Sequence, residues 1–150
     1  MALTVRPAQP EDLEALVHGN AEMARESEGK KLDVATLRAG VAALLADAGK
    51  GRYFVAEADG QFAGQLMITY EWSDWRCGWF WWIQSVYVAH AARGQGVYRR
   101  LHEHVAALAR QAGDVVGLRL YVEENNHRAQ RVYQRCGMAP AHYHVMEQPL

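Results

Sequence analysis

The sequence has few cysteines, few prolines and almost no excess of charge of either sign. Its two cysteines, Cys77 and Cys136, match no metal-binding or redox spacing. We therefore expect two free thiols, as is usual in a cytoplasmic protein, although a bridge between them is an alternative. A net charge of -1 argues against nucleic acid or an anionic membrane surface as the partner.

Long apolar runs are also missing. No stretch is long enough to span a bilayer, and Arg6 and Glu11 interrupt the region where a signal peptide would need one. Linkers, repeats and low-complexity segments are absent from the sequence as well. The chain of 150 residues is half hydrophobic, so we expect one domain, residues 1–150, with a single sizeable core.

Periodicity in the first half predicts a strand, two helices and a hairpin. Leu3 and Val5 belong to the strand, and a helix starts at Pro10 with acidic residues in its first turn. A second helix runs from about Asp33 to Gly49. Strands over 52–58 and 61–70 flank Asp59-Gly60, a dipeptide typical of tight hairpins.

The second half predicts strands that alternate with helices. A strand over 80–88 precedes a helix in which Leu101, Val105 and Leu108 recur at helical spacing. A strand over 115–122 follows, then a helix from Asn126 that stops at Gly137. The alternation from Tyr143 to Glu147 predicts a closing strand.

The stretch from Val86 to Leu101 carries the clearest chemical signal. A strand ends in a turn with Gly94 and Gly96, and a helix begins directly after it. Backbone N–H groups and the helix dipole favour an anion such as phosphate at such a place. The simpler alternative is a strand–turn–helix corner in which the glycines serve only the turn. No P-loop motif is present, and Arg99 stands where the dinucleotide-binding fingerprint needs glycine.

Two motifs together resemble the GCN5-related N-acetyltransferase (GNAT) superfamily. The first is Arg93-x-x-Gly96, directly after Ser-Val-Tyr-Val, which resembles the acyl-CoA pyrophosphate loop; Tyr98 stands where a small residue is usual. The second spans one helix and follows the family pattern in order and spacing. Its matching residues are Asn126, Ala129, Tyr133, Gly137 and Met138.

The resemblance implies an α/β (α+β) fold with a mixed, mainly antiparallel sheet and helices on both faces. It also implies transfer of an acetyl group from acetyl-CoA to a primary amine by direct attack, without a metal. Asn126 would bind the pantetheine arm, and Tyr133 would protonate the leaving thiolate. The remaining residues implied in acetyl-CoA binding are Val86, Tyr87, Val88, Arg93, Gly94, Gln95, Gly96, Val97, Tyr98 and Arg99.

The general base is less clear from the sequence. Histone-type members of the superfamily carry glutamate where this chain has Trp82, and Gln84 on the same face cannot act as a base either. Glu71, Asp74 and Glu123 lie near strand ends, and each is otherwise an ordinary solvated charge. We favour Glu71.

All five tryptophans fall between positions 72 and 82. They are interpreted as buried core, as a face for a homodimer, or as a pocket for a cationic amine. The histidines show no convincing metal spacing. Two other functions remain open: an acyl-CoA-binding sensor without turnover, and a tryptophan-rich interaction domain that does not bind acetyl-CoA. The acceptor is not predicted, because one fold serves many substrates.

Overall fold

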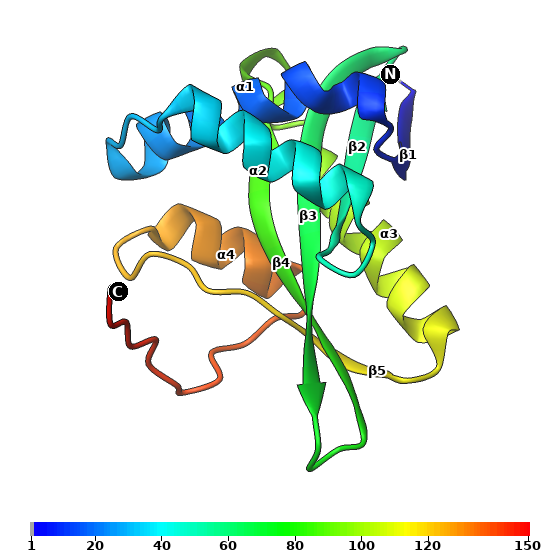
Figure 1. Ribbon diagram of the computed structural model, residues 1–150. Helices are drawn as coiled ribbons and strands as arrows, with labels where there is room; N and C mark the ends of the chain where they lie inside the picture. The colour runs from blue at the N-terminus through cyan, green and yellow to red at the C-terminus, as the bar shows by residue number, and fades with distance from the viewer. Residues whose placement is uncertain (1) are drawn as a thin grey trace. The chain divides into compact units, whose positions relative to one another are not determined.

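Strands and helices follow one another in nearly the predicted order. The structure is a computed structural model that describes residues 2–150 (Figure 1). The strands are β1 (Leu3–Pro7), β2 (Arg52–Ala58), β3 (Gln61–Ser73), β4 (Gly78–Val88) and β5 (Val115–Arg119). The helices are α1 (Leu13–Glu28), α2 (Val34–Ala46), α3 (Val97–Ala112) and α4 (His127–Arg135).

The five strands form one sheet in the order β1-β2-β3-β4-β5. Neighbours from β1 to β4 pair antiparallel, whereas β5 lies parallel to β4. A parallel partner requires a crossover connection, which α3 supplies. The prediction of a mixed, mainly antiparallel sheet is therefore confirmed.

The turn between β2 and β3 forms at Asp59-Gly60, as its sequence predicts. Both residues adopt positive φ, 50° and 79°. Such a turn matches the right-handed twist of the strands that it joins, and it fixes their register at Ala58 opposite Gln61. β3 then continues past the expected end at residue 70 as far as Ser73.

Helices cover both faces of the sheet. Tyr53 and Val55 of β2 pack with Leu16 and Val17 of α1 and with α2, which Figure 1 shows on the near side of the sheet. The intervening Phe54 points the other way, and its ring meets His104 of α3. Helices on both faces are therefore also confirmed.

The chain divides into two compact units, residues 1–119 and 120–150, and each is described by itself. The first contains the sheet with α1, α2 and α3. The second contains α4, which Gly137 ends with a φ of 97°. The closing strand predicted over 143–147 is wrong: this segment forms neither helix nor strand. The positive φ of His142, 62°, breaks the extended backbone just before it, and Tyr143 and Val145 are exposed.

Candidate active site

A bulge interrupts β4 at Ser85. Gln84 pairs with Met67 and Tyr87 pairs with Gln65, so that two residues of β4 face a single residue of β3. Ser85 adopts a φ of 52°, which is uncommon for a residue other than glycine. A bulge of this kind bends a strand and changes the direction of the groups that follow, here Val86, Tyr87 and Val88.

The partner strand on the other side of β4 stops short of the bulge. Pairing between β4 and β5 extends from Trp79 opposite Val115 to Trp82 opposite Arg119, where β5 ends. The segment from Ile83 to Val88 therefore has an edge that β5 does not cover. Such an edge can take an extended ligand as it would take another strand.

Backbone alternation indicates which residues face this edge. The N–H of Ala89 donates to the carbonyl of Ala63 in β3 at 2.8 Å. Because successive backbone groups in a strand point in opposite directions, those of Val88 point away from β3. The structure thus places the predicted Val88 at the uncovered edge, with Val86 beside the bulge.

The chain passes from β4 through a short 3-10 helix, His90–Ala92, into the glycine turn. Gly94 and Gly96 adopt φ values of 76° and 78°, and Gly96 is the N-cap of α3. The first helical hydrogen bond runs from the N–H of Arg100 to the carbonyl of Gly96, at 3.1 Å. The N–H groups of Val97, Tyr98 and Arg99 precede it at the N-terminus of the helix, a position that favours an anion.

The polar side chains of this turn are engaged within the protein. Arg93 donates to the Glu26 carboxylate at 2.6 Å and to the Val88 carbonyl at 3.1 Å. Arg99 pairs with Glu103 at 2.9 Å, and Gln95 donates to the Ala91 carbonyl at 3.4 Å. The turn therefore offers an anion its backbone N–H groups first, with the arginine charges partly offset by carboxylates.

Tyr98, the departure from the family motif, points into the protein. Its side chain is buried, and its hydroxyl hydrogen-bonds Nδ1 of His102 one turn along α3, at 3.0 Å. Burial lowers the pKa of His102 and so favours the neutral imidazole. A large residue is accommodated here because its hydroxyl finds a buried partner, while its backbone N–H stays at the start of the helix.

Substituting Gly96 tests the glycine turn. Gly96→Ala is expected to weaken acetyl-CoA binding about tenfold, because alanine resists the left-handed backbone by about 1–2 kcal/mol and the turn must shift. The added Cβ itself meets open space, so the effect comes from φ alone. Gly40→Ala in α2, which also meets open space, is the matched control in calorimetric titration and should leave affinity unchanged. Equal affinity in both variants would contradict this role.

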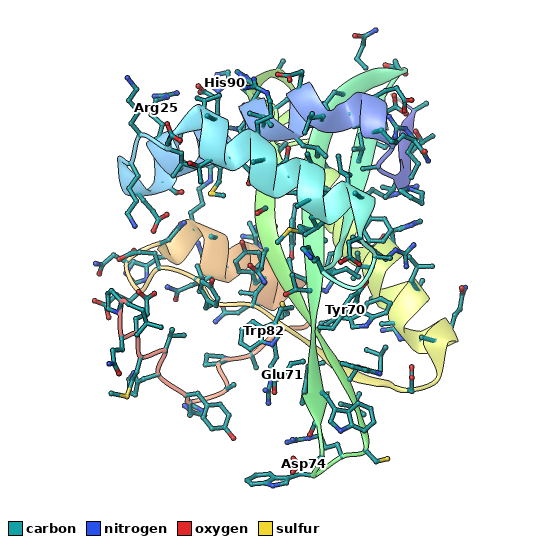
Figure 2. The ribbon with its side chains drawn as sticks, viewed as in Figure 1. Arg25, Tyr70, Glu71, Asp74, Trp82 and His90 are labelled. Atoms are coloured by element: carbon teal, nitrogen blue, oxygen red, sulfur yellow. The ribbon has the colours of Figure 1, made fainter. Side chains whose placement is uncertain are left out.

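Glu71 lies at the centre of a charged group on neighbouring strands. Its carboxylate accepts a hydrogen bond from the indole N–H of Trp82 at 2.8 Å and pairs with Arg119 at 3.2 Å. The Arg119 guanidinium lies 3.6 Å from the centre of the Phe80 ring. Figure 2 shows Glu71 and Trp82 close together on the two strands. The structure thus holds a half-exposed carboxylate in a fixed orientation.

The two other candidate bases lie in different surroundings. Asp74 is in the β3–β4 turn, where it accepts a hydrogen bond from the Trp75 N–H at 2.9 Å, and Figure 2 shows it at the tip of the hairpin. Glu123 belongs to the second unit and accepts from the N–H of Asn125 at 2.7 Å. Both carboxylates shape local turns, whereas Glu71 joins three strands.

The tryptophans separate into distinct groups. Trp82 is on the face of Glu71, whereas Trp72, Trp79 and Trp81 alternate onto the opposite face. There they make edge-to-face contacts around Tyr70, with ring centres 5.0–6.4 Å apart. Trp75 is 87% exposed at the hairpin. Trp72 therefore lies on the face opposite Glu71, and Trp75 lies in the turn between β3 and β4.

In the second unit, the motif residues begin and end α4. The side-chain oxygen of Asn126 caps the helix by accepting from the N–H of Ala129 at 3.1 Å. This cap uses the carboxamide oxygen, and the NH₂ group is what could donate to a ligand. Partial burial and the nearby Cys136 raise the pKa of Tyr133, which keeps its hydroxyl protonated.

Some residues of the site carry no family motif and are not predicted from the sequence. In the sequence, Arg119 is indistinguishable from an ordinary charged residue at the end of a strand. The residues around Ser85 give no sign that it adopts a positive φ. Gln65 could have been noticed in the sequence, because it is a polar residue inside the otherwise apolar run from Ala63 to Ile68. Within residues 2–150, no group of three or more potential metal ligands comes together, and no helix is long and apolar enough to cross a membrane.

Comparison with known proteins identifies the family. The model of the acetyltransferase (GNAT) family matches residues 17–138. A possible acetyltransferase from Clostridium difficile 630 is 39% identical, with a TM-score of 0.93 over 100% of this chain and 99% of that chain. A GCN5-related N-acetyltransferase from Ralstonia eutropha JMP134 is 24% identical, with a TM-score of 0.76 over 99% of each chain, and shares the fold.

A ribosomal-protein-alanine N-acetyltransferase from Brucella melitensis biovar Abortus 2308 also shares the fold, at 17% identity and a TM-score of 0.79 over 99% of each chain. No protein of curated function matches the chain significantly. The family match covers most of the sequence, and it includes both motifs that the sequence presents. The chain therefore belongs to the GNAT family of acetyltransferases.

Proposed function

We propose that the protein transfers an acetyl group from acetyl-CoA to a primary amine by direct attack of the amine on the thioester. The observation that carries this proposal is the uncovered edge of β4, which a short 3-10 helix, His90–Ala92, connects to the glycine turn before α3. An extended amide-bearing arm that ends in a pyrophosphate has the shape and chemistry to bind both features. The pantetheine arm and pyrophosphate of acetyl-CoA form such a molecule.

In this proposal, backbone groups of Val86 and Val88 pair with the pantetheine arm, with Tyr87 between them. The segment from Arg93 to Arg99, which includes Gly94, Gln95, Gly96, Val97 and Tyr98, binds the pyrophosphate mainly through backbone N–H groups. Asn126 donates its carboxamide NH₂ to the pantetheine. The same backbone groups of β4 can polarise the thioester carbonyl, which favours the tetrahedral transition state.

Glu71 and Tyr133 act on protons in the proposed reaction. The neutral amine attacks the thioester carbonyl, and Glu71 accepts the proton that the nitrogen loses, directly or through a water molecule. The C–S bond then breaks, and the hydroxyl of Tyr133 donates its proton to the leaving thiolate. The products are an N-acetyl amide and CoA with a free thiol.

The proposal treats residues 1–150 as one acetyltransferase domain, since the family match extends across both units. Cys77 and Cys136 form no disulfide, which suits a cytoplasmic enzyme because a reducing compartment keeps thiols unbridged. The exposed Trp72 and Trp75 on the hairpin offer an apolar surface for a homodimer. Neither a metal nor nucleic acid has a part in this reaction.

Thiol release with a panel of amines tests the activity. The panel includes polyamines, amino-acid derivatives, lysine and peptides with free N-termini, and mass spectrometry detects the acetylated product. We expect at least one amine to release CoA and to gain one acetyl group in equal amounts. Acetyl-CoA binding without turnover on any amine would favour a sensor, and the absence of binding would favour an interaction domain.

A further inference from the structure

A buried glutamine lies directly under the bulge of β4. Gln65 of β3 is 0% exposed, and its side-chain NH₂ donates to the backbone carbonyl of Ser85 at 3.2 Å. Its side-chain oxygen is also buried and has no hydrogen-bond partner. Retaining an unpaired buried acceptor disfavours folding, so a polar residue at this position needs a reason beyond stability.

Two further buried polar residues reach the same bulge. The hydroxyl of Tyr53 in β2 accepts a hydrogen bond from the side chain of Asn20 in α1 at 3.0 Å, and the Ser85 side chain lies beside the same hydroxyl. Asn20 also donates to the carbonyl of Leu16. Tyr53 and Asn20 are 5% and 4% exposed. We call Asn20, Tyr53, Gln65 and Ser85 the bulge network.

Gly19 allows α1 to lie against this network. A Cβ at this position would approach the side-chain oxygen of Gln65 to 2.2 Å and the Tyr87 ring to 3.1 Å. Any larger residue would displace either the helix or Gln65. Glycine inside a helix is unfavourable, so its presence next to Asn20 fits a requirement for close packing over the bulge.

We propose that the bulge network is a positioning device for acetyl-CoA binding, which holds Ser85 in its left-handed backbone conformation. The hydrogen bond from Gln65 to the Ser85 carbonyl and the contact of the Ser85 side chain with the Tyr53 hydroxyl oppose the return of Ser85 to a regular extended strand. Without the bulge, the register of Tyr87 and Val88 against β3 would shift by one residue. A shift of one residue reverses which backbone groups face the uncovered edge.

This inference rests on the proposed function, because it concerns the edge assigned to the pantetheine arm. It adds residues that do not touch the reacting atoms and that act through Ser85. It also separates binding from stability. Loss of Gln65 removes one hydrogen bond to the bulge but also removes the unpaired buried oxygen, so its effects on these two properties should differ.

The test measures CoA affinity and thermal unfolding for Gln65→Met and Tyr53→Phe. Methionine has nearly the shape of glutamine, and phenylalanine lacks only the hydroxyl. We expect each variant to weaken CoA binding and to raise the KM of acetyl-CoA about five- to tenfold. The KM of the amine should stay unchanged. The Tm of Gln65→Met should remain within a few degrees of the wild type.

Two controls make the test specific. Tyr70→Phe removes a hydroxyl from the opposite face of the sheet and should leave CoA affinity unchanged. Ser85→Gly removes the steric strain of a positive φ at this position. In the Ser85→Gly protein, Tyr53→Phe should therefore weaken CoA binding less than twofold. A lowered Tm with unchanged CoA affinity would overturn the positioning role. Failure of the wild-type protein to bind CoA would instead overturn the proposed function, and this inference with it.

Discussion

Tyr133→Phe is expected to lower kcat about 100-fold while the KM of acetyl-CoA stays unchanged. The substitution removes only the hydroxyl, and a proton donor to the leaving group typically contributes a factor of about 10²–10⁴. The raised pKa of Tyr133 means that the hydroxyl keeps its proton throughout the neutral and mildly alkaline range. Since a general acid acts in its protonated form, any loss of rate from its ionisation should begin only above about pH 10.

The measurement is steady-state thiol release with the best amine acceptor. Tyr143→Phe is the matched control, because Tyr143 is exposed and lies outside α4. It should retain wild-type kcat. An unchanged kcat in Tyr133→Phe would remove the general-acid role, and a loss seen only in the KM of acetyl-CoA would reassign Tyr133 to binding.

Glu71→Gln is expected to lower kcat by a similar factor, about 100-fold, and to leave acetyl-CoA affinity intact. Glutamine has the same shape as glutamate and can still accept the hydrogen bond from Trp82, so the geometry changes little. It cannot accept a proton from the amine. Arg119 loses its ion pair with residue 71 but keeps its contact with the Phe80 ring, and 24% of its side chain is exposed, so the protein should still fold.

The pH–rate profile separates this role from a purely electrostatic one. If Glu71 is the base, the decline of kcat/KM on the acid side of the profile should be altered in Glu71→Gln. Asp74→Asn removes the same charge at the tip of the hairpin and should leave the profile and kcat unchanged. A Glu71→Gln enzyme with the wild-type profile would show that Glu71 is not the base.

Local signals in the sequence predicted the parts of the fold that depend on neighbouring residues. Asp59-Gly60 forms its turn because both residues tolerate positive φ, whatever lies around them. Gly94 and Gly96 likewise determine a turn whose position between a strand and a helix follows from hydrophobic periodicity. The same holds for Gly137 at the end of α4.

Local sequence signals do not predict which distant segments of the chain pair with one another. The bulge at Ser85 depends on Gln65 and Tyr53, which are 20 and more residues away along the chain. The ion pair between Glu71 and Arg119 joins residues 48 positions apart. The closing strand failed for the same reason, because the alternation near Tyr143 is a local pattern and a strand also needs a partner.

Calorimetric titration of the CoA-free protein with acetyl-CoA is the most direct test of the proposed acetyl-CoA site. We predict binding at one site per chain, weakened both by Gly96→Ala and by charge reversal in Arg93→Glu or Arg99→Glu. Absence of binding at any accessible concentration would contradict it. The stretch from Val86 to Leu101 would then be only a turn between a strand and a helix. The hairpin of β3 and β4, which carries the five tryptophans, would become the leading candidate for the functional surface.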